Sequence, residues 1–177
     1  MKYLIVSCSL NSSSNSRALA HNAYKILTEQ GTEVEFLDIS KIDLPICDGN
    51  KCYSNANVKL IKEKVMQASG ILFAVPIYTY DVNAAAKNLV ELVGRTLSEK
   101  VVGFICAAGG FGSYMSVMPF ANSLMLDFRC VIIPRFVYAV EDDINENQEI
   151  VNDKINLRMK ELIDCLLKFT PLLVSPK

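Results

Sequence analysis

The chain has 177 residues, of which 51% are hydrophobic and 21% are charged, and its formal net charge is −1. This size and composition are typical of one globular domain with a sizeable core. A charge so close to zero points to neither a nucleic-acid nor an anionic-membrane partner. No stretch reaches the roughly 20 apolar residues of a membrane span, and the apolar run 3–6 is shorter than the roughly 7–15 residues of a signal-peptide core. We therefore expect a cytoplasmic protein with no membrane partner.

Short apolar runs alternate with helical patterns along the chain. Runs that are apolar on both faces and rich in Val, Ile and Phe are typical of strands buried in a parallel sheet. They occupy residues 3–8, 34–37, 70–75, 101–107 and 131–133. A helical pattern follows each run, and the first helix ends just before Gly31. Five such units predict an α/β fold, a parallel sheet with helices on both faces and right-handed crossovers.

No linker or internal repeat divides the chain. We expect a single domain over residues 1–170 and a C-terminal tail over 171–177, because Pro171 and Pro176 follow the apolar stripe of the last helix. The acidic stretch 141–149 is interpreted as a solvated connection and helix start.

A hydroxyl-rich loop follows the first strand and leads straight into the first helix. Seven of the nine residues 9–17 are Ser or Asn, whereas a helix N-cap needs one. Backbone N–H groups and the helix dipole favour an anion at this place. The loop matches neither G-x-G-x-x-G nor G-x-x-x-x-G-K-[ST], which disfavours a Rossmann dinucleotide site and a P-loop. The loop is therefore interpreted as a site for one phosphate monoester.

Two further loops would lie on the same edge of the sheet, where open α/β sheets bind their ligands. The loop after the third strand carries Pro76, Tyr78 and Tyr80. The loop after the fourth carries Gly109 and Gly110, whose lack of a side chain lets a ligand approach the backbone closely. A phosphate loop, an aromatic loop and a glycine loop together suit a flat, aromatic, phosphorylated cofactor.

The cysteines and the single histidine give little support for thiol, metal or triad chemistry. Four cysteines lie in or beside apolar segments and are interpreted as core residues: Cys8, Cys106, Cys130 and Cys165. Cys47 and Cys52 lie in the longest loop, 38–57, and are interpreted as two loop thiols, with a redox pair as the alternative. Two thiols do not complete a zinc or iron–sulfur site, so no metal is expected. His21 is expected at a solvated helix position.

Three blocks of the sequence resemble the NAD(P)H-dependent FMN reductases of the flavodoxin-like superfamily. The blocks are SCSLNSSSNSRALA, VPIYTYDVNAAAKNLVEL and AAGGFGSYMSVMPFANSLMLDFRCVIIP, and they occur in the family's order across nearly the whole chain. The resemblance implies a five-stranded sheet of order 2-1-3-4-5, one FMN per subunit, and association into homodimers or homotetramers with the site near an interface.

The resemblance also implies which residues hold the cofactor. The phosphate block contributes Ser9, Asn11, Ser14, Asn15, Ser16 and Arg17. The second block borders the isoalloxazine with Pro76, Ile77, Tyr78, Thr79 and Tyr80. The glycine block presents backbone N–H groups to the pyrimidine edge of the ring with Ala108, Gly109 and Gly110. Lys87 and Asn88 are interpreted as structural, and no side chain is expected to act as acid or base, because the flavin supplies the chemistry.

The chain departs from the family pattern at Cys8, where glycine is usual, and at Asn11, where many members carry an arginine. NADH therefore stays open beside NADPH as the co-substrate. The loop 79–84 also lacks the usual glycines.

We expect an oxidoreductase that passes hydride from NAD(P)H to FMN and on to a small acceptor such as free flavin or a quinone. Two alternatives remain open: a flavodoxin-type FMN electron carrier without its own NAD(P)H site, and a non-flavin module that binds another phosphate.

Overall fold

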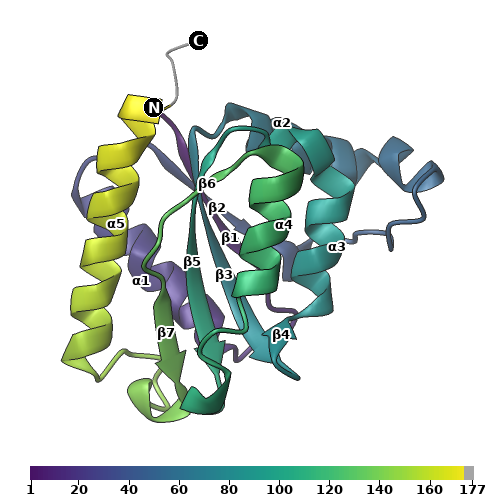
Figure 1. Cartoon of the computed structure of the whole chain (residues 1–177). Coiled ribbons are helices and arrows are strands. Elements are labelled where there is room, and N and C mark those ends of the chain that lie inside the picture. The colour runs from purple at the N-terminus through teal and green to yellow at the C-terminus, as the bar shows by residue number, and fades with distance from the viewer. Residues whose placement is uncertain (174–177) are drawn as a thin grey trace.

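The structure is a computed structural model that describes residues 1–173. Its centre is a parallel sheet, with the strands labelled in Figure 1. The parallel strands lie side by side in the order β2 (Val34–Asp38), β1 (Tyr3–Ser7), β3 (Gly70–Tyr78), β5 (Val101–Ala108) and β6 (Val131–Ile132). This is the expected flavodoxin-like order 2-1-3-4-5 of the five predicted strands. The predicted fold class is confirmed.

The sheet has seven strands rather than the five expected. The fifth predicted strand, 131–133, corresponds to β6, and a further strand that was not predicted, β7 (Val137–Val140), continues it along β5; both are parallel to β5. Pro134 lies between them and has no N–H to donate to the ladder, which explains the interruption. β4 (Asp81–Val82) pairs antiparallel with the end of β3. It follows a two-residue turn at Thr79 and Tyr80, both with positive φ, as a tight hairpin turn requires.

Helices cover both faces of the sheet. α1 (Asn15–Glu29) and α5 (Asp153–Leu173) lie on one face, and α2 (Ala56–Gln67), α3 (Ala84–Val93) and α4 (Met118–Phe128) on the other (Figure 1). α5 continues through Pro171 to Leu173, three residues past the expected domain boundary. The rest of the expected tail, 174–177, lies outside the described residues.

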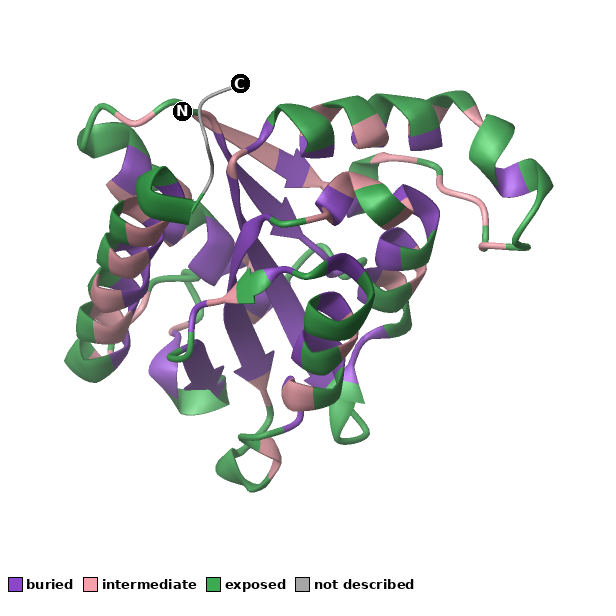
Figure 2. Cartoon of the chain, turned by 45° about the horizontal axis from the view of Figure 1, so that its top comes forward, coloured by how far each residue is buried: buried purple, intermediate pink, exposed green. Residues whose placement is uncertain are grey.

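The hydrophobic core is divided by the sheet into two parts. Figure 2 shows the central strands almost entirely buried, as in β1, β3 and β5, whereas the edge strand β2 is mostly of intermediate burial; each helix turns a buried side inward and an exposed side to solvent. Beneath α4, the rings of Phe73 and Phe104 both contact Phe120, each pair with centroids 5.9 Å apart. On the opposite face of the sheet, Met159 and Leu162 of α5 pack against the strands. Burial on both faces explains why the strands are apolar runs.

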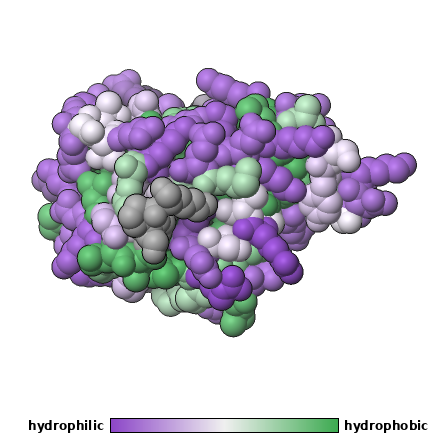
Figure 3. Space-filling model, turned by 90° about the horizontal axis from the view of Figure 1, so that it is seen from above, coloured by the Kyte–Doolittle hydropathy of each residue, from purple (hydrophilic) through white to green (hydrophobic). Residues whose placement is uncertain are grey.

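The carboxyl ends of the parallel strands point to the bottom of Figure 1, where the three loops of interest gather. The opposite end, seen in Figure 3, is mainly hydrophilic with scattered apolar patches. Within residues 1–173, no helix combines the length and apolarity needed to cross a membrane.

Gly103 is a position of β5 where the core leaves no space for a side chain. A Cβ there would lie 2.8 Å from a methyl of Leu72 and 2.9 Å from one of Leu162, and both leucines are fully buried. We expect Gly103→Ala to lower the free energy of unfolding by about 1–3 kcal/mol, as overpacking does. Urea unfolding of the cofactor-free protein measures this. Gly109→Ala is the control, because a Cβ at Gly109 meets no atom within 4 Å. Equal stabilities of the two variants would contradict the prediction.

Candidate active site

A cavity of about 330 Å³ opens at the carboxyl edge of the sheet, between the ends of β1, β3 and β5. Nine of the fourteen residues expected at the cofactor line it: Asn11, Ser14, Asn15, Ser16, Pro76, Ile77, Tyr78, Ala108 and Gly109. The three predicted loops therefore meet around one hollow. This convergence follows from the parallel order of the strands, because each loop leaves the sheet at the same edge.

Three of the other expected residues line a neighbouring cavity of about 240 Å³. Thr79, Tyr80 and Gly110 lie there, and Ile77 contributes to both cavities. A Cβ on Gly112 would come within 3.7 Å of the Tyr80 hydroxyl, so the hairpin after β3 lies close to the glycine loop. The remaining two, Ser9 and Arg17, line neither cavity.

Sequence reasoning missed three residues of the main cavity, namely Ser13, Ala107 and Glu141. Ser13 belongs to the serine run, so the run itself was a sufficient signal. Glu141 was expected in a solvated connection, and its side chain is indeed exposed. It comes directly after β7, and it would have been found only if the second half of the split strand had been recognised.

The amino end of α1 forms the polar corner of the cavity. Ser14 occupies the N-cap position, but its hydroxyl lies 2.8 Å from that of Ser16 and makes no capping hydrogen bond within the described chain. Both serines are buried. The N–H groups of the first helical turn are thus not covered by the cap side chain, and the helix dipole adds positive potential at this point. The corner suits an anion.

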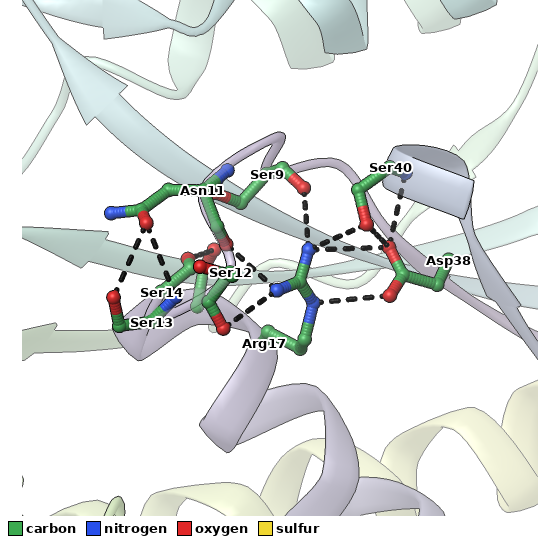
Figure 4. A network of polar contacts seen from close by, with 9 residues as sticks. Ser9, Asn11, Ser12, Ser13, Ser14, Arg17, Asp38 and Ser40 are labelled. Carbon is green, nitrogen blue, oxygen red and sulfur yellow. Dashed lines mark hydrogen bonds and ion pairs between the residues drawn. The ribbon is translucent and has the colours of Figure 1, made fainter. Parts of the chain in front are cut away.

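Arg17 stands at the centre of a network shown in Figure 4. Its guanidinium donates to the carbonyl oxygens of Asn11 at 2.7 Å and Ser12 at 2.9 Å, and to that of Ser9 at 3.0 Å. Its Nε lies 3.1 Å from Oδ2 of Asp38 in an ion pair. The predicted role of Arg17 as a direct phosphate ligand does not fit this geometry. The guanidinium instead holds the loop in shape.

The orientation of the carbonyl groups has a consequence for the N–H groups of the loop. A trans peptide plane points its C=O and the following N–H in opposite directions. Because the carbonyls of Ser9 and Asn11 point at Arg17, the N–H groups of Leu10 and Ser12 point away from it. The residues of the cavity wall within 1–173 include neither Lys nor Arg, and Glu141 is the charged one. An anion there would depend on neutral donors and the helix dipole.

Ser9 belongs to the loop rather than to the wall. Its side chain is buried, and its hydroxyl oxygen accepts a hydrogen bond from the N–H of Asn11 at 3.2 Å. Asn11 in turn accepts from the N–H of Ser13 at 3.1 Å. These short-range bonds explain the abundance of Ser and Asn, because both residue types satisfy backbone groups inside an irregular loop.

Asn83 joins the serine-rich loop after β1 to the hairpin after β3. Its side-chain amide donates to the carbonyl of Cys8 at 2.7 Å, and its backbone N–H donates to the carbonyl of Pro76 at 3.1 Å. Asn83 is buried, and its Oδ1 has no hydrogen-bond partner among the residues described. The ends of β1 and β3 are thus held together at the carboxyl edge of the sheet.

Tyr138 of β7 holds the glycine loop. Its hydroxyl donates to the carbonyl of Gly110 at 2.7 Å and also lies 2.7 Å from the hydroxyl of Ser113. The side chains around this loop are exposed aromatics: Tyr78 and Tyr80 are 54% and 72% exposed, and Phe111 is 67% exposed. Flat, accessible rings at the rim suit a planar ligand.

Known proteins resemble this chain in sequence and in fold. A family model described as NADPH-dependent FMN reductase matches residues 1–144. The chain is 28% identical over 132 residues to an NAD(P)H-dependent FAD/FMN reductase of Geobacillus thermodenitrificans (strain NG80-2), which covers 73% of this chain and 71% of the relative. It is 27% identical over 149 residues to an NADPH:quinone oxidoreductase of Arabidopsis thaliana, covering 79% and 76%.

Among solved structures, the flavoenzyme FerB, an NAD(P)H:(acceptor) oxidoreductase of Paracoccus denitrificans, superposes with a TM-score of 0.80. The identity is 16%, and 97% of this chain and 98% of that chain are covered. The likeness to FerB supports the fold, and the family model supplies the assignment. Since that model spans most of the chain, including all three site loops, the protein belongs to the NADPH-dependent FMN reductase family.

Proposed function

We propose that the cavity at the carboxyl edge holds FMN, with the phosphate at the amino end of α1. Members of this family use FMN with NAD(P)H as the electron donor. The observation that carries the placement is the polar corner at Ser14 and Ser16, where the first turn of a helix opens into a cavity. The hydroxyls and N–H groups there would donate to the phosphate oxygens.

The wall of the cavity fits the rest of the cofactor. A Cβ on Gly109 would enter open space, so the backbone there is accessible to a ligand. Pro76, Ile77 and Tyr78 would border the isoalloxazine. When bound, FMN accepts a hydride from NAD(P)H and passes its electrons to a second substrate. The backbone N–H groups of Gly109 and Gly110 would stabilise negative charge at the pyrimidine edge, because donors that are already in place need no reorganisation.

The second substrates would enter through the neighbouring cavity between Tyr80 and Gly110. Its wall combines small residues with the exposed ring of Tyr80, which leaves room for a planar ring to stack. We propose NADH or NADPH as the donor and a small oxidised molecule, free flavin or a quinone, as the acceptor.

An exposed apolar patch at the rim of the cavity bears on how the protein assembles. Exposed apolar side chains gather at the rim, including Phe111, Tyr114 and Met115. Such patches mark interaction surfaces, and a homodimer or homotetramer would cover them. We further propose that residues 1–170 form the FMN-binding domain and that the protein acts in the cytoplasm.

The first test separates an enzyme from an electron carrier. The FMN-loaded protein is mixed anaerobically with NADH and with NADPH, and the flavin absorbance is followed. We expect at least one nucleotide to bleach the flavin, because the open cavity gives the nicotinamide access. We also expect parallel double-reciprocal lines when nucleotide and quinone are varied, since both would use the same site in turn. A flavin that stays oxidised with both nucleotides but bleaches with dithionite would support the carrier alternative.

The second test asks how Arg17 contributes. Asp38→Asn keeps the guanidinium but removes the carboxylate that pairs with it. Since hydrogen bonds to charged groups contribute about 1.5–3 kcal/mol, we expect a loosened loop and about tenfold weaker FMN binding, measured by flavin fluorescence titration.

The direction of the change in FMN affinity distinguishes a loop-holding Arg17 from a phosphate-binding Arg17. If Arg17 bound the phosphate directly, releasing it from Asp38 would tighten FMN binding, and that result would contradict the loop-holding role. Asp127→Asn on α4 is the control, because it makes the same change of net charge on the other face of the sheet. Riboflavin titration of each variant shows whether the effect depends on the phosphate.

A further inference from the structure

Two thiols lie together in the arm between β2 and α2. The Sγ atoms of Cys47 and Cys52 are 3.9 Å apart, and no disulfide joins them. The arm projects from the body of the protein at the right of Figure 1 and contains the short helix Lys51–Ser54. The other four cysteines come from separate elements: β5, α5, the end of β1 and the end of α4.

The backbone of the arm holds the two cysteines in place. The Asp48 carboxylate accepts hydrogen bonds from the N–H of Asn50 at 2.9 Å and of Cys52 at 3.0 Å. These bonds hold the pKa of Asp48 down, at about 2. On the other side, Asn88 of α3 accepts from the N–H of Cys47 at 2.8 Å and donates to the carbonyl of Pro45 at 3.0 Å. The expected structural role of Asn88 is thus the anchoring of this arm.

The two thiols differ in access. Cys47 is half-buried and lines a cavity of about 350 Å³ together with Tyr53, Lys87 and Arg95. The Tyr53 hydroxyl lies 3.6 Å from the Cys47 sulfur, where it can donate to a thiolate. Cys52 is 4% exposed. Burial also raises the pKa of the Cys52 thiol. Because Cys47 is the more accessible of the two, it is the thiol that an oxidant in solution reaches first.

A metal site does not explain the pair. Across residues 1–173, no group of three or more His, Cys, Asp or Glu is placed to hold a metal ion. Disulfide formation needs the sulfurs to approach from 3.9 Å to about 2.05 Å, a movement that side-chain rotation in a solvent-exposed arm can supply.

We propose that Cys47 and Cys52 form a peroxide-oxidisable dithiol that closes into an intramolecular disulfide. The Cys47 thiolate attacks one oxygen of the peroxide, the O–O bond breaks, and a sulfenic acid and hydroxide form. The Cys52 sulfur then attacks the sulfenic sulfur, its proton combines with the departing oxygen, and water leaves. Two thiols and one hydrogen peroxide thus give one disulfide and two waters. Hydrogen peroxide is the oxidant, and the flavin takes no part in the step.

The test uses the reduced, FMN-loaded full chain treated with hydrogen peroxide, then alkylated and digested with trypsin. Lys51 lies between the two cysteines, so cleavage separates peptides 42–51 and 52–59. We expect these peptides to remain joined by a disulfide, and the intact protein to lose two thiols and two hydrogen atoms. The other four cysteines should be recovered as alkylated thiols.

Single variants show which cysteine reacts with the peroxide and which one then closes the disulfide. Cys52→Ser should accumulate a sulfenic acid on Cys47 that dimedone traps, whereas Cys47→Ser should leave Cys52 as a free thiol. Cys165→Ser is the control and should form the disulfide like the wild type. Six free thiols after peroxide treatment, or a disulfide that includes any other cysteine, would overturn the proposal. If a serine variant fails to fold, the peptide pair from the wild type still decides the question.

Discussion

The site depends on how Arg17 holds the loop that precedes its own helix. One guanidinium binds the carbonyls of Ser9, Asn11 and Ser12, and Asp38 balances its charge from the end of the neighbouring strand β2. The seven-residue loop 8–14, which contains no glycine, would otherwise sample many conformations, and ordering it costs about 1–2 kcal/mol per residue. Arg17 offsets part of this cost before a ligand arrives. An anion then meets N–H groups that are already oriented.

The remaining loops are fixed by equally specific contacts, each between residues distant in sequence. Asn83 bonds to Cys8, 75 positions away, and Tyr138 bonds to Gly110, 28 positions away. Thr79 and Tyr80 hold left-handed backbone conformations that cost non-glycine residues about 1–2 kcal/mol each. Pairing of Asp81 with Tyr78 and burial of Val82 offset this strain. The loops around the cavity are therefore held in place by contacts within the fold.

The fold could be predicted from the sequence because buried parallel strands and amphipathic helices leave periodic patterns. Nine cavity residues could be found too, since the order of the strands determines which loops converge. The direction of the Arg17 side chain could not be predicted, because it depends on Asp38, which no local pattern links to the serine loop. Glu141 was missed for a related reason: Pro134 splits the last strand, so the apolar run appeared to end before β7. The proximity of Cys47 and Cys52 depends on the side chains of Asp48 and Asn88, and spacing alone does not reveal it.

We propose that loop amides, hydroxyls and a helix N-terminus, held in place by Arg17, bind the phosphate of FMN. Parallel calorimetric titrations of the cofactor-free protein with FMN and with riboflavin test it most directly, because the two ligands differ only in that phosphate. We expect FMN to bind at least tenfold more tightly than riboflavin, equivalent to about 1.4 kcal/mol. Equal affinities for the two ligands would contradict it, since the phosphate would then contribute nothing to binding.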